Sequence, residues 1–238
     1  MHNVLIILQR ELSSYFNSAL AFVVIPVFLL MVGGFSLYFQ DFFAAGILDM
    51  RSIFFWCAVS FLLLIPAFSM RAFAEEIRTG SIELLVTLPI RDEELVLGKF
   101  LSVFSIVCFS LLLTLSYPIT LSELGEMDWG QIIGGYIGLA LLGAALSAIG
   151  VAASASTKNQ VISFLLAFAV SVVPFVMGYV LSSVPVDILP VVQYLSFDYH
   201  FSNLAKGIID SRNIIFYGSV VALALHLAVF QLEQRRLK

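Results

Sequence analysis

The chain has 238 residues, of which 61% are hydrophobic and 12% are charged, and its mean hydropathy is +1.03. Because about a quarter of the residues in a soluble domain are charged, this composition excludes an ordinary soluble domain and indicates a membrane protein with several spans. The net charge of −4 is divided between two faces of a membrane, so it gives no indication of a nucleic acid partner.

Residues 1–17 predict an amphipathic helix. Six apolar residues of this segment fall within about a third of a helical wheel, and they are Val4, Leu5, Leu8, Leu12, Tyr15 and Phe16. A helix with one apolar face lies in the membrane interface with that face among the lipids. We therefore expect an interfacial helix on the cytoplasmic side, with a cytoplasmic extension of the first span as the alternative.

Six uncharged runs follow, each of spanning length, since a transmembrane helix needs roughly 20 apolar residues. The runs are Ala19–Phe39, Ser52–Met70, Phe100–Ser122, Trp129–Thr157, Asn159–Val186 and Asn213–Leu232. We therefore predict an all-α membrane protein with six transmembrane helices, forming a single domain over residues 1–238.

The basic residues predict the orientation of these spans. An even number of spans places both termini on one side of the membrane, together with nine of the twelve Lys and Arg residues. These nine are Arg10, Arg71, Arg78, Arg91, Lys99, Lys158, Arg235, Arg236 and Lys238. Because cytoplasmic loops are enriched in Lys and Arg, we expect both termini to be cytoplasmic.

The longest charge-rich interval, residues 75–91, lies between the second and third runs. Gly80 permits a sharp turn, and the pattern predicts two helical turns over Ile82–Leu88 that end before Pro89, because a proline disfavours helix at the preceding residue. Such a short helix is unstable alone, and its wide apolar surface must dock. It docks either on another protein or on the cytoplasmic ends of its own spans and the lipid interface.

Small residues dominate the fourth run, where Gly134 and Gly138 form a GxxxG pair. Such pairs let a second helix approach closely. That helix belongs either to the same chain or to a second copy.

Residues 183–212 form the longest external segment, and their apolar content is too high for a free loop. We expect one or two short helices that partly re-enter the bilayer or lie over the external mouth. His200 in this segment is either a ligand or gate residue, or a local hydrogen-bonding residue.

Several kinds of chemistry are missing from the sequence. None of the six runs contains Asp, Glu, Lys or Arg, although ion-coupled transporters need such side chains inside their spans. There is no GxxxxGK[ST] phosphate-binding loop and no HExxH motif, and Cys57 and Cys108 are typical of apolar core positions. We expect no catalytic residue, no metal and no bound cofactor, so any driving energy must come from outside the chain.

Two stretches resemble the type-2 ABC exporter permeases. The cytoplasmic stretch reads Glu75-Glu76-x-Arg78-x-Gly80-Ser81-Ile82-Glu83-Leu84-Leu85-x-Thr87-Leu88-Pro89 and continues as Glu94-Leu95-Val96-Leu97-Gly98-Lys99-Phe100. The external stretch reads Leu195-Ser196-x-x-Tyr199-His200-Phe201 and continues as Gly207-Ile208-Ile209-Asp210. Within that family, both are similar to the branch of the gliding-motility permease and the permease of nitrous-oxide-reductase maturation.

The resemblance implies that Ile82–Leu88 is a coupling helix seated in a groove of a separate ABC ATPase subunit, which binds the ATP and Mg. It assigns the ATPase contact to Glu75, Glu76, Arg78, Gly80, Ile82, Glu83, Leu84, Leu85, Leu88 and Pro89, and an external gate to Tyr199, His200, Phe201, Gly207 and Asp210. It also implies a second permease copy, an accessory extracytoplasmic subunit, membrane lipid as a neighbour, and a location in the cell (inner) membrane.

The leading hypothesis is therefore the transmembrane permease subunit of an ATP-driven exporter. The alternative is a non-transporting scaffold or assembly factor that recruits a cytoplasmic protein through the same helix. Substrate-dependent ATP hydrolysis separates these two, because a scaffold would not show it. A secondary carrier or channel is disfavoured by the absence of charge in the spans.

Overall fold

The computed structural model describes residues 2–39, 50–82, 90–123, 127–180 and 188–236. Within these residues the secondary structure is helical, with no strand. The helices are α1 (His2–Asn17), α2 (Ala19–Phe39), α3 (Arg51–Ser69), α4 (Ala74–Thr79), α6 (Asp92–Thr114), α7 (Ser116–Ser122), α8 (Trp129–Ser156), α9 (Gln160–Val180), α10 (Leu189–Leu195), α11 (Phe197–Ala205) and α12 (Ser211–Arg236).

The described residues contain six helical segments that are long and apolar enough to cross a membrane, which confirms the predicted number of spans. Five of them centre on α2, α3, α8, α9 and α12. The remaining span, predicted as one run, is divided into α6 and α7. Pro118 explains this division, because a proline has no N–H to donate and its ring clashes with the carbonyl four residues before it, at Thr114, where α6 ends.

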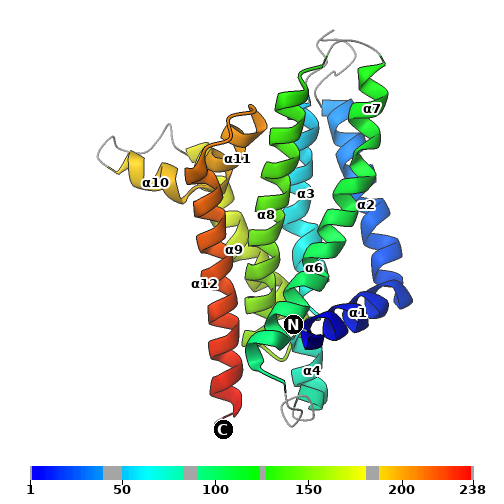
Figure 1. Cartoon of the computed structure of the whole chain (residues 1–238), viewed down its shortest axis with the longest axis vertical. Coiled ribbons are helices and arrows are strands. Elements are labelled where there is room, and N and C mark those ends of the chain that lie inside the picture. The colour runs from blue at the N-terminus through cyan, green and yellow to red at the C-terminus, as the bar shows by residue number, and fades with distance from the viewer. Residues whose placement is uncertain (1, 40–49, 83–89, 124–126, 181–187, 237–238) are drawn as a thin grey trace.

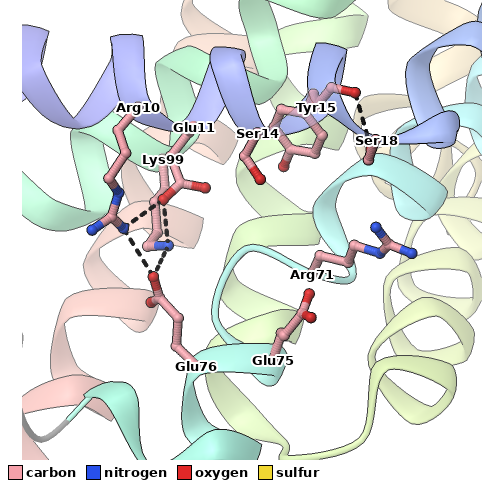
Figure 2. A pocket seen from close by; sticks show the side chains of 9 residues that line it. All are labelled: Arg10, Glu11, Ser14, Tyr15, Ser18, Arg71, Glu75, Glu76 and Lys99. Atoms are coloured by element: carbon pink, nitrogen blue, oxygen red, sulfur yellow. Dashed lines mark hydrogen bonds and ion pairs between the residues drawn. The ribbon is translucent and has the colours of Figure 1, made fainter.

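The two ends of the bundle differ in character (Figure 1). We call the end that holds α1, α4 and the last turns of α12 the termini end, and the opposite end, with α7, α10 and α11, the far end. At the termini end α1 runs across the bundle rather than along it, and polar side chains gather between α1 and α4 (Figures 1 and 2).

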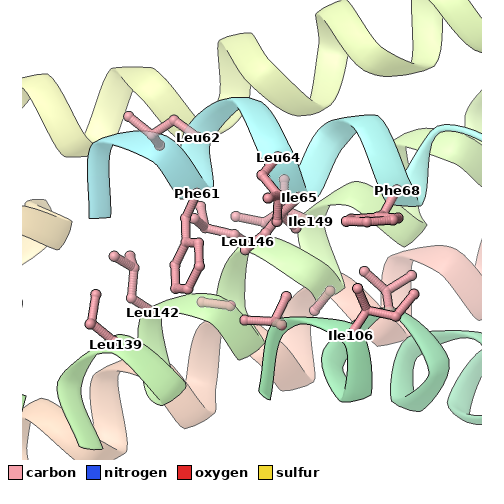
Figure 3. Close-up of a cluster of buried hydrophobic side chains, with 14 of the residues drawn as sticks. Phe61, Leu62, Leu64, Ile65, Phe68, Ile106, Leu139, Leu142, Leu146 and Ile149 are labelled. Carbon is pink, nitrogen blue, oxygen red and sulfur yellow. The ribbon is translucent and has the colours of Figure 1, made fainter. Parts of the chain in front are cut away.

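Helix α8 lies at the centre of the bundle and contacts α3, α6, α9, α11 and α12. Its glycines allow this close packing: a Cβ on Gly135 would overlap the Phe54 ring of α3, and one on Gly143 would lie 2.7 Å from a methyl of Val107 on α6. Buried apolar side chains from α3, α6 and α8 interlock in the core around these contacts (Figure 3). The predicted small-residue surface is thus used within the chain.

Helix α1 has apolar residues on two faces rather than on the single face expected. Ile7 and Tyr15 are buried against the bundle, whereas Leu5 and Phe16 have 61% and 39% of their surfaces exposed. The close approach of α1 to α6 requires Gly98, because a Cβ there would lie 2.7 Å from the Ile7 side chain. One apolar face of α1 therefore packs on protein, and the other remains available to lipid.

Candidate functional site

Helix α4 begins the segment predicted to contact an ATPase, and the central helix α8 anchors its first turn. The backbone N–H groups of Phe73 and Ala74 donate to the Ser154 hydroxyl at 2.9 and 3.0 Å, and that hydroxyl donates to the Met70 carbonyl at 3.1 Å. The first N–H groups of a helix have no partner within the helix. Ser154 therefore supplies from another helix the cap that no side chain at the start of α4 provides.

Gly80 ends α4 in the left-handed conformation, with φ of 73°, which a glycine adopts without strain. Ser81 and Ile82 then resume a helical conformation, and Ile82 packs half-buried against the core. The remainder of the predicted coupling helix, with Glu83, Leu84, Leu85, Leu88 and Pro89, lies outside the described residues. Its docking partner stays a prediction.

Lys99 of α6 is the most deeply buried charged side chain among the described residues, with 1% of its surface exposed. Its ammonium pairs with Glu76 of α4 at 2.9 Å and with Glu11 of α1 at 3.1 Å, and it donates to the Ala72 carbonyl (Figure 2). It also lies 5.0 Å from the centre of the Phe73 ring. One cation thus joins α1, α6 and α4, and also the turn that leads into α4.

Arg10 completes this ion network from the solvent side. Its guanidinium pairs with Glu11 at 2.8 Å and with Glu76 at 3.1 Å. Burial raises the pKa of Glu11, but the Lys99 and Arg10 charges outweigh that effect, so the pKa of this carboxyl lies below its ordinary value. Glu11 therefore stays ionised at neutral pH. We refer to Arg10, Glu11, Glu76 and Lys99 as the ion network.

The structure places the first predicted contact residues in different environments. Glu76 faces Lys99 in the ion network, Glu75 lines the neighbouring pocket, and Arg78 is exposed in the last turn of α4. Arg78 is therefore open to solvent, whereas Glu76 pairs within the chain.

Sequence reasoning missed Glu11 and Ser154, and it did not assign a role to Lys99. The signal for Lys99 was present, because a lysine followed by an uncharged run of spanning length must find a counter-ion or reach the membrane surface. Its two partners lie 88 and 23 positions away along the chain, so no local pattern could identify them.

Two of the predicted external gate residues, His200 and Phe201, are buried at the far end of the bundle. The ring nitrogens of His200 lie 2.7 Å from Asn213 Oδ1 and 2.9 Å from the Tyr194 carbonyl oxygen, and the ring stacks on Phe216 at 4.0 Å. His200 is 2% exposed. It therefore links α10, α11 and α12 through hydrogen bonds, which corresponds to the local hydrogen-bonding alternative.

The other residues of this set hold α11 on α8 and begin α12. Phe201 packs over Gly138, Gly207 has φ of 81° and lies against the α8 backbone, and the Asp210 side chain accepts from the Arg212 N–H at 2.9 Å. Tyr199 is 39% exposed. The helix that packs on the Gly134 and Gly138 face of α8 is therefore α11 of the same chain, and not a helix of a second copy. A gating role for these residues stays a prediction.

Metal ligands do not cluster in the described part of the chain, where no group of three His, Cys, Asp or Glu side chains could hold an ion. In the ion network, one oxygen of each carboxylate, Oε1, pairs with both Lys99 and Arg10. The ion network therefore has a structural role, which is to fix the position of α4 relative to α1 and α6.

A protein-family model described as "ABC-2 family transporter protein" matches residues 16–229 of the chain. The matched region includes five of the six spans and most of the sixth, the ion-network residues Glu76 and Lys99, and helices α10 and α11. A comparison with curated proteins gave no match.

Proposed function

This chain belongs to the ABC-2 family of transporter proteins, as a multi-pass permease, and we propose that it couples ATP hydrolysis by a separate ATPase subunit to export of a substrate. The ATPase binds the ATP and Mg, and it contacts the segment that begins at α4. The observation that carries this proposal is the buried Lys99 of α6. Its ammonium pairs with Glu76 of α4 and with Glu11 of α1, and so connects α4 to the helices of the bundle.

The strength of this tie follows from the cost of burying charge. A buried cation that loses its counter-ions leaves an uncompensated charge, so the pairs resist separation even where their net contribution to stability is small. Displacement of α4 by a cytoplasmic partner is therefore transmitted to α1 and α6 rather than absorbed locally. Such transmission is what a coupling segment requires.

The proposed topology follows the distribution of charge. The termini end collects most of the basic residues, so it faces the cytoplasm in the inner membrane. The functional unit contains two permease copies, identical or related, and an accessory extracytoplasmic subunit at the far end. The resemblance of residues 75–100 and 195–210 favours the branch of the gliding-motility and nitrous-oxide-reductase-maturation permeases.

A double substitution, Leu84→Asp with Leu85→Asp, tests the ATPase contact. The wild-type chain, purified from its native membrane, should carry Mg-dependent ATPase activity, and the double variant should lose it. Ile208→Asp with Ile209→Asp is the matched control, because these side chains are 58% and 56% exposed at the far end. A wild type without ATPase activity, or a double variant that keeps it, contradicts the proposal.

A second measurement separates the exporter from a scaffold. In an exporter, trapping the ATPase with ATP and vanadate should change amide hydrogen exchange in α10 and α11, because the transport cycle reaches the far end. A scaffold would retain the ATPase and show no change there.

A further inference from the structure

A groove of about 370 Å³ lies between α9 and α12 on the outside of the bundle. Both helices pack on α8, which forms the floor of the groove with Ala152 and Ala153 (Figure 1). The walls are apolar and open, since Val170 of α9 and Leu223 of α12 are 53% and 65% exposed. Because α9 and α12 are membrane spans, the groove faces the interior of the bilayer.

The two ends of the groove differ. Phe197 of α11 closes it toward the far end, where the Phe197 carbonyl accepts a hydrogen bond from the Tyr217 hydroxyl at 2.9 Å. Toward the termini end its lining becomes polar, with the Ser156 hydroxyl 3.3 Å from Gln231 Oε1. Ser156 is exposed. The groove therefore leads from the apolar middle of the membrane to the polar surface at the termini end.

The size of the groove selects its occupant. From Val220 to Gln231, at 1.5 Å per residue, it is about 16 Å long, which matches one leaflet, about half of the roughly 30 Å hydrocarbon core. A helix about 10 Å across would need roughly 1,200 Å³ over this length. The groove is therefore too narrow for a helix of a second copy, and its length and apolar lining fit a single acyl chain.

Two basic side chains lie beyond the polar end of the groove. Lys158 is exposed in the turn two residues after Ser156. Arg235 is four residues beyond Gln231, about one helical turn, and so lies on the same side of α12, whereas Glu233 lies on the opposite side. Within the described residues neither Lys158 nor Arg235 forms an ion pair. Such a pair of cations at the membrane surface favours an anionic head group.

We propose that this groove holds one acyl chain of an anionic phospholipid from the leaflet at the termini end, with the lipid phosphate between Lys158 and Arg235. The second acyl chain stays in the surrounding bilayer. The bound lipid joins α9 to α12 along the floor provided by α8. This inference does not depend on the identity of the ATPase or of the transported substrate.

Native mass spectrometry of the full chain tests the proposal. The protein is exchanged into micelles with equal amounts of phosphatidylglycerol and phosphatidylcholine that carry identical acyl chains, and retained lipids are counted. The wild type should retain phosphatidylglycerol preferentially. Lys158→Gln with Arg235→Gln should lower this preference about 30-fold, the combined factor for two basic residues at an anionic surface. Arg71→Gln with Arg91→Gln, at exposed residues before α4 and α6, removes the same charge and should keep the preference.

A second pair of variants tests the groove itself. Ala152→Phe should lower retention of both lipids, because its ring would occupy the space of the acyl chain. Ala222→Phe is the matched control, since Ala222 is exposed on α12 and does not line the groove. The charge substitutions lie outside the core, so they decide the test if Ala152→Phe does not fold.

Equal retention of the two lipids by the wild type, or an unchanged preference in Lys158→Gln with Arg235→Gln, would overturn the assignment. An equal loss in the Arg71 and Arg91 control would do so as well, since it would indicate a general effect of charge. A lipid-free dimer that Ala152→Phe converts to monomers would show that a second copy covers the groove instead.

Discussion

Replacing Lys99 with Met should release α1 from the bundle. The substitution keeps an unbranched side chain of similar length but removes the cation between Glu11 and Glu76. Removing one partner of a buried ion pair costs about 3–5 kcal/mol. Arg10 still pairs with both carboxylates, but its side chain is 51% exposed, so water weakens its compensation. We therefore expect the lower limit, about 3 kcal/mol, which is a change of more than about 100-fold in an opening equilibrium.

Hydrogen exchange measures this opening directly, because local unfolding exposes backbone amides in proportion to the opening equilibrium. Amides of α1 and α4 should exchange faster in Lys99→Met, while those of α8 and α12 should be unchanged. Leu97→Met is the control, since Leu97 lies on the same helix and is 40% exposed.

A double-mutant cycle distinguishes the ion pair from simple loss of packing. Glu76→Gln should recover part of the loss when it is combined with Lys99→Met, because it removes the carboxylate that the first change leaves unpaired. Unchanged exchange of α1 in Lys99→Met, or strictly additive effects in the cycle, would refute the reasoning.

Three further predictions test other contacts, each by thermal unfolding in detergent. Ser154→Ala should destabilise the protein by about 2 kcal/mol, because it leaves buried N–H groups at the start of α4 without an acceptor; an unchanged melting temperature would show that they find another partner. Burial raises the pKa of Asp198, although a hydrogen bond from Tyr179 opposes that effect, so its contribution to stability is lost as pH rises from the ordinary carboxyl pKa through the raised one. Asp198→Asn should therefore raise the melting temperature at pH 7 and not at pH 3, and an equal gain at both would contradict the sign. Gly134→Ala should displace α11, because its Cβ would lie 2.5 Å from a backbone carbonyl oxygen, whereas Gly218→Ala has open space and should be tolerated.

Much of the fold follows from the sequence because a membrane imposes a simple rule on length and charge. The uncharged runs of spanning length correctly predicted six membrane spans, and residues 2–17 form the helix expected there. The exact ends were harder to predict, since Pro118 divides one predicted span into α6 and α7. The two faces of α1 were also missed, because a helical wheel cannot tell lipid from protein.

The site was less predictable because its contacts join distant parts of the chain. Lys99, Glu11 and Ser154 each act through partners on other helices, and only the packing of α1 and α8 brings them together. Gly80 is different, since its turn depends on its own backbone. Local chemistry could therefore predict where the proposed coupling segment turns, but not which residues hold it in place.

Helix α8 joins the two ends of the molecule in one piece. It runs from Trp129 to Ser156 with no proline, so at 1.5 Å per residue it is a rod of about 42 Å. Ser154 holds the start of α4 near one tip, and Gly134 supports α11 near the other. A small tilt imposed on the Ser154 end of α8 would move the Gly134 end in the opposite direction. Helix α8 would then act as a lever that pivots where its middle packs in the core.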